Sequence, residues 1–342
     1  MLKKQIKKQI KKTIMYQTLE QEKNLLKNQV DTLQKDQENL LNQIKNLQKE
    51  VQNLKNQVNN QQNREKDHER LINALKAENK SIKDIYLEND IPNYDYNDLT
   101  IILPYRKTDD PVREENLDIK LRYLNKIGLK NIIISEHSDN SEADFLIDRY
   151  GNLFDSFKVI FNNANGELFN KSLAINKGVI ESKTKYIGIS DIDCLTENKN
   201  VNKSIKLLNK GFEVVHPFNR VINDIVDKDK FKQEYDFKTV DSPKQYRDWA
   251  DGGIVFWNKE AFISIGMKNE NFNGWGGEDN EILIRARLFQ LKQIRIDETL
   301  YHLYHERPQI RTKNNVEQLE KIEQIKDEKD LLNEIKGWEW AN

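Results

Sequence analysis

The first 91 residues contain no glycine, proline, tryptophan or phenylalanine, although the 342-residue chain has 13, 6, 5 and 13 of these residues respectively. Glycine and proline interrupt helices, and large aromatic side chains supply much of the buried area of a globular core. A segment that lacks both kinds of residue is suited to a long uninterrupted helix. The sequence therefore predicts an elongated N-terminal segment ahead of a globular part.

Apolar residues recur at steps of four and three between residues 26 and 58, which is the heptad spacing of a coiled coil. The d positions are leucines: Leu26, Leu33, Leu40, Leu47 and Leu54. The a positions are β-branched, Val30, Ile44, Val51 and Val58, except for Gln37. This distribution favours a parallel homodimer. The alternatives are a single solvated helix and a disordered tail.

The segment ahead of the heptads is basic, because six lysines and no acidic residue precede Glu20. Leucine and isoleucine recur every four residues among these lysines, which is typical of an amphipathic helix. Such an arm is suited to peripheral contact with an anionic membrane surface or an acidic partner. The simpler interpretation is a solvated helix start.

The whole chain carries 55 basic and 56 acidic residues, so it has no net field for a polyanion and a nucleic-acid binder is disfavoured. Its one cysteine, Cys194, excludes an internal disulfide and a cysteine-based zinc cluster. It has no run of about 18 apolar residues and no stretch resembling a signal peptide. These features predict a cytoplasmic protein without a transmembrane helix.

Beyond Pro92 the pattern changes to short β-branched runs that alternate with helical stretches. The runs predict strands at residues 99–103, 131–135, 158–161, 186–190, 213–216 and 253–257. Helical stretches are expected at 281–290 and at 316–335, the latter with Leu319, Ile322, Leu332 and Ile335 on one side. The alternation predicts an α/β fold with a mostly parallel sheet, in which ligands bind beyond the carboxyl ends of the strands. The predicted domains are 1–90, 91–312 and a C-terminal helix, 313–342.

Asp191 and Asp193 follow the predicted strand 186–190. In extended backbone, residues two apart point to the same side, so both carboxylates are positioned to address one ligand, such as a cation that holds a diphosphate. A D-x-D pattern is also common in solvated loops. It becomes informative only together with other motifs.

A stronger signal is the stretch from Phe272 to Asn280, in which three glycines surround Trp275 and two acids, Glu278 and Asp279, open a helix. Glycine lets the backbone approach a ligand closely, and an indole offers a flat face to a sugar ring. Carboxylates at a helix start gain from the helix dipole and can accept protons. The alternative is a glycine-rich helix entry with a packing tryptophan and a capping acid.

Two of the five histidines, His302 and His305, lie three residues apart. A single histidine is more often a hydrogen-bonded structural residue than a metal ligand. A histidine is nevertheless what a two-carboxylate site needs to bind a borderline ion such as Mn²⁺.

The order of these motifs resembles the β-1,4-galactosyltransferase family over residues 98–310. The motifs are Pro104-Tyr105-Arg106, Phe169-Asn170-Lys171, Asn176-Lys177-Gly178, Ser190-Asp191-Ile192-Asp193, Gly252-Gly253, Gly274-Trp275-Gly276-Gly277-Glu278-Asp279 and a late histidine. The resemblance implies a GT-A fold and an inverting transfer of galactose, or of a related hexose or N-acetylhexosamine, from a UDP-sugar with Mn²⁺ or another divalent cation. The stretch 275–287 is also similar to the retaining polypeptide N-acetylgalactosaminyltransferases and to chondroitin-polymerase-type transferases. Asp279 stands where the retaining family has asparagine, and an inverting displacement needs a carboxylate there.

The resemblance implies a role for each matching position. The nucleotide pocket would be lined by Pro104, Tyr105, Arg106, Glu136, Phe169, Asn170, Lys171 and Asp191. The metal would be held by Asp191, Asp193, His302 and His305. The residues that contact the sugars would be Gly253, Trp275, Gly276, Gly277 and Glu278. Asp279 would be the base that deprotonates the acceptor hydroxyl.

Three positions depart from the family pattern. Lys171 replaces an arginine and is a weaker bidentate clamp for a diphosphate. His302 replaces a methionine ligand and makes the metal site harder, and Asn280 replaces a third acid. Two other functions stay open: a coiled-coil scaffold with a degenerate, carbohydrate-binding transferase domain, and a sugar nucleotidyltransferase. The latter should have a glycine-rich loop after its first strand, but no glycine occurs before Gly128.

Overall fold

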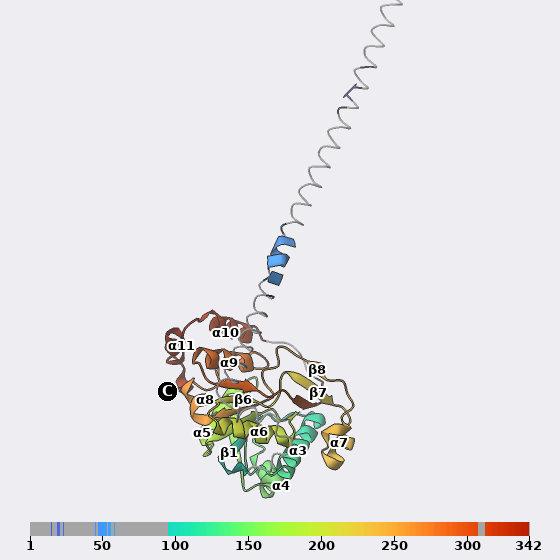
Figure 1. Cartoon of the computed structure of the whole chain (residues 1–342), viewed down its shortest axis with the longest axis vertical. Helices are drawn as coiled ribbons and strands as arrows, with labels where there is room; N and C mark the ends of the chain where they lie inside the picture. Colours follow the sequence, from blue (N-terminus) through green and yellow to red (C-terminus); the bar gives the residue numbers. More distant parts are fainter. Residues whose placement is uncertain are drawn as a thin grey trace, which may run out of the picture. The chain divides into compact units, whose positions relative to one another are not determined.

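The computed structural model describes residues 95–306 and 312–341, and in the N-terminal segment only Met15, Leu19, Glu20, Lys23, Lys45, 47–52, Leu54, Lys55 and Val58 (Figure 1). The chain divides into two units, Met1–Asn79 and Lys80–Asn342. All described residues of the first unit are helical, and four seam positions, Leu47, Val51, Leu54 and Val58, are at least half exposed. The remainder of the predicted coiled coil and of the basic arm lies outside the described residues, so both stay predictions.

The main sheet of the second unit has seven strands within the described residues. In spatial order they are β10 (Gln293–Arg295), β6 (Val214–His216), β9 (Ile254–Asn258), β4 (Tyr186–Ser190), β1 (Leu99–Tyr105), β2 (Asn131–Ser138) and β3 (Ser156–Asn163). The strands β4, β1, β2 and β3 are parallel, whereas β9 is antiparallel to both β4 and β6. All six predicted strands are confirmed, and the fold is mixed α/β with a parallel half.

The central strand β1 is buried along its whole length, as strands within the parallel part of a sheet usually are. Helix α5 (Lys171–Glu181) crosses it closely: a Cβ at Gly178 would lie 2.6 Å from Ile102 Cγ2, so only glycine fits there. Asn170 caps this helix by accepting a hydrogen bond from the Leu173 amide. The close crossing fixes where Lys171, the first residue of α5, stands relative to the strand ends.

The other helices flank the two sheets (Figure 1). They are α3 (Pro111–Lys126), α4 (Ala143–Tyr150), α6 (Asn198–Asn209), α7 (Lys228–Glu234), α8 (Lys259–Ser264), α9 (Glu278–Leu288), α10 (Lys313–Gln324) and α11 (Glu328–Ile335), with 3₁₀ turns at Tyr96–Asp98, Gly151–Leu153, Phe237–Thr239 and Glu339–Ala341. Among the residues that the structure describes, no helix combines the length and the apolar character needed to cross a membrane.

A second, four-stranded sheet within the described residues was not predicted from the sequence. Its order is β5 (Cys194–Leu195), β11 (Thr299–Leu303), β7 (Val221–Ile225) and β8 (Gln245–Tyr246). Two of these strands have only two residues, too few to give a periodic signal. The register places His302 of β11 opposite both Cys194 and Asp224. This small sheet therefore brings the histidine strand next to the D-x-D turn.

The single C-terminal helix expected at residues 316–335 is wrong, because the structure has two helices there. The chain is extended at Ile325, and Asp327 caps α11 by accepting from the Asp330 amide. The break rotates the second helix, so Leu331 is buried while Leu332, expected on the apolar side, is 38% exposed. Both helices pack on α9 through a cluster of apolar side chains (Figure 1). They brace the helix that begins with Glu278 and Asp279.

Candidate active site

The glycine-rich stretch before α9 directs two acids into one place. Gly277 is the N-cap residue of α9 and has φ 103°, in the left-handed region that only glycine occupies without strain. A Cβ there would also lie 2.9 Å from Phe272 Cε1. Helix α9 thus starts at Glu278 and Asp279, where the positive end of the helix dipole favours negative charge. Trp275, just ahead of them, is 40% exposed.

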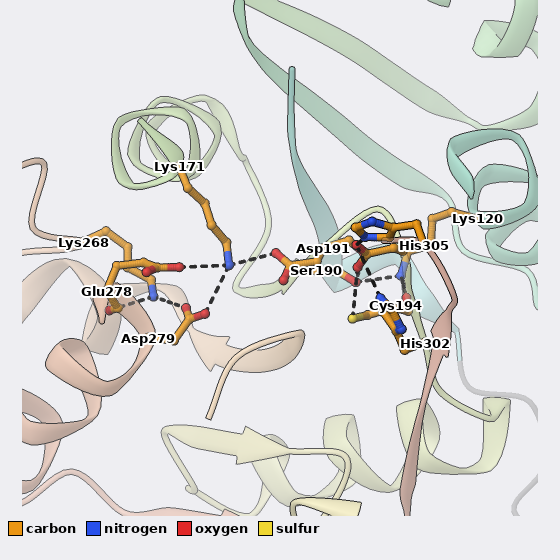
Figure 2. A network of polar contacts seen from close by, with 11 residues as sticks. Lys120, Lys171, Ser190, Asp191, Cys194, Lys268, Glu278, Asp279, His302 and His305 are labelled. Atoms are coloured by element: carbon orange, nitrogen blue, oxygen red, sulfur yellow. Dashed lines mark hydrogen bonds and ion pairs between the residues drawn. The ribbon is translucent and has the colours of Figure 1, made fainter. Parts of the chain in front are cut away.

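Two buried lysines hold these acids (Figure 2). Lys171 Nζ lies 3.1 Å from Asp279 Oδ2, 3.3 Å from Glu278 Oε1 and 2.9 Å from Asp191 Oδ1. Lys268 Nζ lies 2.5 Å from Asp279 Oδ1 and also donates to the Glu278 carbonyl. Burial alone would lower the pKa of Lys171, but attraction to the three carboxylates raises it well above its ordinary value. Lys171 is therefore a permanent cation at the centre of the site.

The environments of the two adjacent acids push their pKa values in opposite directions. Burial would raise the pKa of Asp279, but Lys171 and Lys268 together hold it well below its usual range. Burial and the neighbouring Asp279 raise the pKa of Glu278. Glu278 Oε2 is buried and, among the described residues, meets no hydrogen-bond partner. The pair thus combines a firmly ionised carboxylate with a carboxyl group whose charged form is disfavoured.

The D-x-D acids lie in a turn at the carboxyl end of β4, not in extended backbone as the sequence argument assumed. Asp191 is directed at Lys171, whereas Asp193 Oδ2 lies 2.8 Å from His305 Nε2. Ligand atoms of the two acids nevertheless lie within 4.8 Å of each other. Burial, together with repulsion from Asp193 and Asp279, raises the pKa of Asp191 despite Lys171. The turn therefore connects the lysine cluster to the histidines.

Asp193, His302 and His305 form a group whose possible ligand atoms all lie within 4.8 Å of one another. His302 Nε2 is 3.8 Å from Asp193 Oδ2. His305 Nδ1 lies 2.9 Å from the Glu306 carbonyl, which can only accept, so Nδ1 carries a proton and Nε2 faces Asp193. Two imidazole nitrogens and a carboxylate oxygen suit a borderline divalent ion such as Mn²⁺ or Zn²⁺. The predicted metal residues Asp193, His302 and His305 fit such an ion as a set.

The residues expected around the nucleotide come to neighbouring strand ends. Tyr105 of β1 is in register with Glu136 of β2, and the Arg106 guanidinium lies 5.7 Å from the centre of the Phe169 ring. The Tyr105 hydroxyl donates to Glu114, and Glu136 accepts from the Glu142 amide, so both side chains are held within the protein. The remaining expected contacts, Pro104 and Asn170, stand in β1 and at the N-cap of α5. Nucleotide contact by this group remains a prediction.

The glycine pair ahead of β9 lies between the acid helix and the D-x-D turn. A Cβ at Gly252 would be 1.9 Å from Asp279 Oδ2, and the Gly253 carbonyl accepts from the Asp191 amide. Asn280 donates to Asp251, which also binds Arg220 and Arg295. The position that carries a third acid in the family thus anchors this glycine loop instead.

Three polar residues at the site, two buried and one largely buried, were not found from the sequence. Lys268 clamps Asp279, Asp224 Oδ1 lies 2.7 Å from His302 Nδ1, and Lys120 of α3 donates to Ser190 Oγ and the Cys194 carbonyl. Each is at least 70 residues from its partner except Lys268, which is 11 away. No local motif marks them, because their roles depend on contacts between distant segments.

A family model described as the N-terminal domain of galactosyltransferase matches residues 237–307. This match confirms the resemblance to galactosyltransferases over the segment that holds Trp275, Glu278, Asp279, His302 and His305. Over that segment the chain is similar to galactosyltransferases, which are enzymes that transfer a sugar. No curated protein matches the chain.

Among solved structures, the chain is similar to a mutant Drosophila β1,4-galactosyltransferase 7 in complex with manganese, UDP-Gal and xylobiose (16% identity, 67% of this chain and 82% of that chain, TM-score 0.44). It is also similar to GalNAc-T7 with UDP, GalNAc and Mn²⁺ (14% identity, 67% of this chain and 48% of that chain, TM-score 0.45). A third similar structure is glucosyl-3-phosphoglycerate synthase from Mycobacterium tuberculosis with Mn²⁺, UDP and phosphoglyceric acid (12% identity, 61% of this chain and 71% of that chain, TM-score 0.39).

Proposed function

We propose that this chain is a metal-dependent, inverting glycosyltransferase of the GT-A type that moves galactose, or a related hexose or N-acetylhexosamine, from a UDP-sugar to a hydroxyl group of a glycan or other acceptor. The observation that carries the proposal is the convergence of two groups. Asp193, His302 and His305 form one, and Glu278 and Asp279 the other, with Asp191 and Lys171 between them (Figure 2). The galactosyltransferase match supports it.

The first group fits a divalent ion, with Asp193, His302 and His305 as its ligands and Asp191 beside it. When bound, the ion supplies positive charge that offsets the charge of the UDP leaving group. Arg106, Phe169 and Lys171 bind and orient the nucleotide, together with Pro104, Tyr105, Glu136 and Asn170. Lys171 lies between the two groups and contacts three carboxylates. A bound diphosphate would attract this lysine away from them.

Asp279 accepts the proton of the acceptor hydroxyl in this proposal. Lys268 and Lys171 keep it ionised, so it is ready to take a proton at neutral pH. The same cations weaken it as a base. Movement of Lys171 to the diphosphate removes one of the two and raises the pKa of Asp279, which couples donor binding to base strength. Glu278 Oε2 accepts a sugar hydroxyl, and Trp275 offers its face to the acceptor ring beside Gly276, Gly277 and Gly253.

The N-terminal segment dimerises two catalytic units through a parallel coiled coil in this proposal, and its basic arm provides peripheral contact with an anionic surface. The cytoplasmic location inferred from the single cysteine is also part of the proposal. No nucleic acid is required as a partner.

The test is a UDP-release assay of the full chain with a panel of UDP-sugars and hydroxyl acceptors, with and without Mn²⁺. We expect release from one sugar class, dependent on Mn²⁺ and lost in Asp193→Ala. Asp229→Ala, which removes a 90% exposed carboxylate, is the charge-matched control and should retain full activity. UDP binding without release from any sugar would contradict the proposal and support the carbohydrate-binding scaffold.

A further inference from the structure

Asp224 pairs with one histidine of the proposed metal group. It stands opposite His302 in the parallel register of β7 and β11, and its Oδ1 lies 2.7 Å from His302 Nδ1. Both side chains are largely buried, at 15% and 6% exposure. No motif of the sequence marks Asp224, and the proposed reaction does not use it.

The chemistry of this contact sets the state of the imidazole. An ionised carboxylate can only accept, so the proton of a neutral His302 ring resides on Nδ1. The lone pair then resides on Nε2, the atom that lies 3.8 Å from Asp193 Oδ2. We propose that Asp224 is a positioning residue that fixes the ring orientation and tautomer of His302, so that Nε2 serves as a metal ligand. This inference rests on the proposed function, because it concerns the metal group of that site.

Asp224 is itself held from two sides. Its Oδ2 lies 3.5 Å from an Arg247 guanidinium nitrogen, and Ser242 donates to its backbone carbonyl. Arg247 also lies 5.8 Å from the centre of the Trp249 ring, in the segment after β8. The carboxylate therefore has a charge partner on one oxygen and His302 on the other, which limits rotation of the histidine ring.

The second histidine provides an internal comparison. His305 Nδ1 is hydrogen-bonded to the backbone carbonyl of Glu306, which no side-chain substitution removes. A change at Asp224 should therefore act on one of the two histidines only. Carboxylates and carbonyls that accept from the distal nitrogen of a ligating histidine typically change metal affinity by about 10-fold to 100-fold when removed.

The experiment measures Mn²⁺ affinity of the full chain directly, by electron paramagnetic resonance of free Mn²⁺, without a sugar substrate. Asp224→Ala should weaken binding by about 10-fold to 100-fold. Asp224→Asn keeps an amide oxygen that can still accept from Nδ1–H, so it should restore part of the affinity. Asp229→Ala, in the same segment, is the charge-matched control and should bind as the wild type does. Circular dichroism confirms that each variant is folded.

The decisive comparison uses His302→Met, whose thioether has no N–H for Asp224. Asp224→Ala should have no added effect on Mn²⁺ affinity in that background. An equal loss with and without His302, or no loss at all from Asp224→Ala alone, would overturn the positioning role. A wild-type chain that binds no Mn²⁺ would instead overturn the metal site of the proposed function, so the two failures are distinguishable.

Discussion

Lys171 illustrates how a single substitution of residue type alters this site. An arginine in its place would present a planar fork suited to two phosphate oxygens. The lysine ammonium is a point charge, and in the structure it contacts three carboxylates within 3.3 Å. A compact cation can satisfy carboxylates in different directions, which a planar group does less well. The lysine thus connects three carboxylates in the absence of a donor.

Asp279→Asn tests the base. The amide keeps the size of the side chain and its single oxygen can still accept from one of the two lysines, but it cannot take a proton. Transfer should fall by about 100-fold or more, the effect of losing a positioned base, while the Kd for Mn²⁺ changes little and the Kd for UDP does not rise, because Lys171 is held less tightly. Steady-state kinetics and equilibrium binding check both parts. Near-normal turnover, or a product that retains the donor's anomeric configuration by NMR, would refute the assignment.

Gly252→Ala tests the same acid by a steric route. The added Cβ would lie 1.9 Å from Asp279 Oδ2, so the carboxylate must move. The added Cβ would also lie 2.6 Å from Asp279 Cγ, and two lysines hold this carboxylate, so we expect a loss of thermal stability. Transfer activity should fall by about 10-fold or more for misplacing a positioned base. Gly151→Ala, whose Cβ would meet only Ile147 at 3.7 Å, is the matched control. Equal activity of the two variants would argue against a reacting role for Asp279.

Helix α3 supports the site through three polar side chains that lie on one of its faces. Asn116, Lys120 and Tyr123 lie on one face at helical spacing and donate to the Leu303 carbonyl, to Ser190 Oγ and the Cys194 carbonyl, and to the Thr196 carbonyl. These acceptors lie at the ends of β4 and β11 and just after β5. One helix therefore anchors the backbone on both sides of the D-x-D turn, although none of its residues belongs to the predicted site.

Lys120 gives this element a measurable pH dependence. Burial lowers its pKa from 10.5 to about 8, despite attraction to Asp193 and Asp191. Between these two values the unfolded chain binds the proton and the folded chain does not, so stability should rise with pH. Relative to Lys120→Met, the free energy of unfolding of the wild type should rise by up to about 3 kcal/mol from pH 8 to pH 10.5. Below pH 8 the difference between the two proteins should stay constant.

Denaturant unfolding of both proteins without added metal, at pH values on either side of this window, measures the difference. Lys177→Met removes an exposed lysine of α5 and is the matched control for the loss of one charge. A wild-type advantage that is flat with pH would show that Lys120 remains protonated in the fold.

The whole molecule combines an N-terminal segment whose sequence lacks tryptophan and phenylalanine with a unit that contains several clusters of buried apolar side chains. Seam side chains of the described N-terminal residues, such as Leu47 and Leu54, are more than half exposed in the single chain. Exposed leucines at heptad spacing are the surface that a second helix covers in a coiled coil. We therefore expect assembly to reside in the N-terminal segment and folding of the catalytic part to be independent of it.

Separating the chain tests this division. Residues 1–90 alone should be helical and dimeric, because the β-branched a and leucine d positions favour two strands. Residues 92–342 alone should be folded and monomeric. Sedimentation equilibrium at tens of micromolar, with circular dichroism, checks both fragments. A monomeric N-terminal fragment would contradict the dimer, and a dimeric catalytic fragment would locate assembly elsewhere.

The strands β1 and β2 were predictable because each contains a run of β-branched residues, and β4 because two isoleucines alternate in a short apolar stretch. The start of α9 was predictable as well, because glycines and adjacent acids mark a helix N-terminus. The second sheet was not, since β5 and β8 have two residues each and are held only by their neighbours. The break between α10 and α11 was missed because no glycine or proline marks it, although the charged residues 326–330 interrupt the apolar spacing there.

The amino-acid sequence by itself determined the separation into a heptad segment and an α/β unit. It also determined the galactosyltransferase-like motifs and the acids at the start of α9. Each of these features depends on residues that lie close together along the chain. Only the tertiary structure decided that Lys171 and Lys268 clamp Asp279, that Asp193 faces His305 rather than Lys171, and that Asp224 meets His302. These contacts join different strands and helices across the site. Their distances follow from strand register and helix packing, which local residue patterns do not encode.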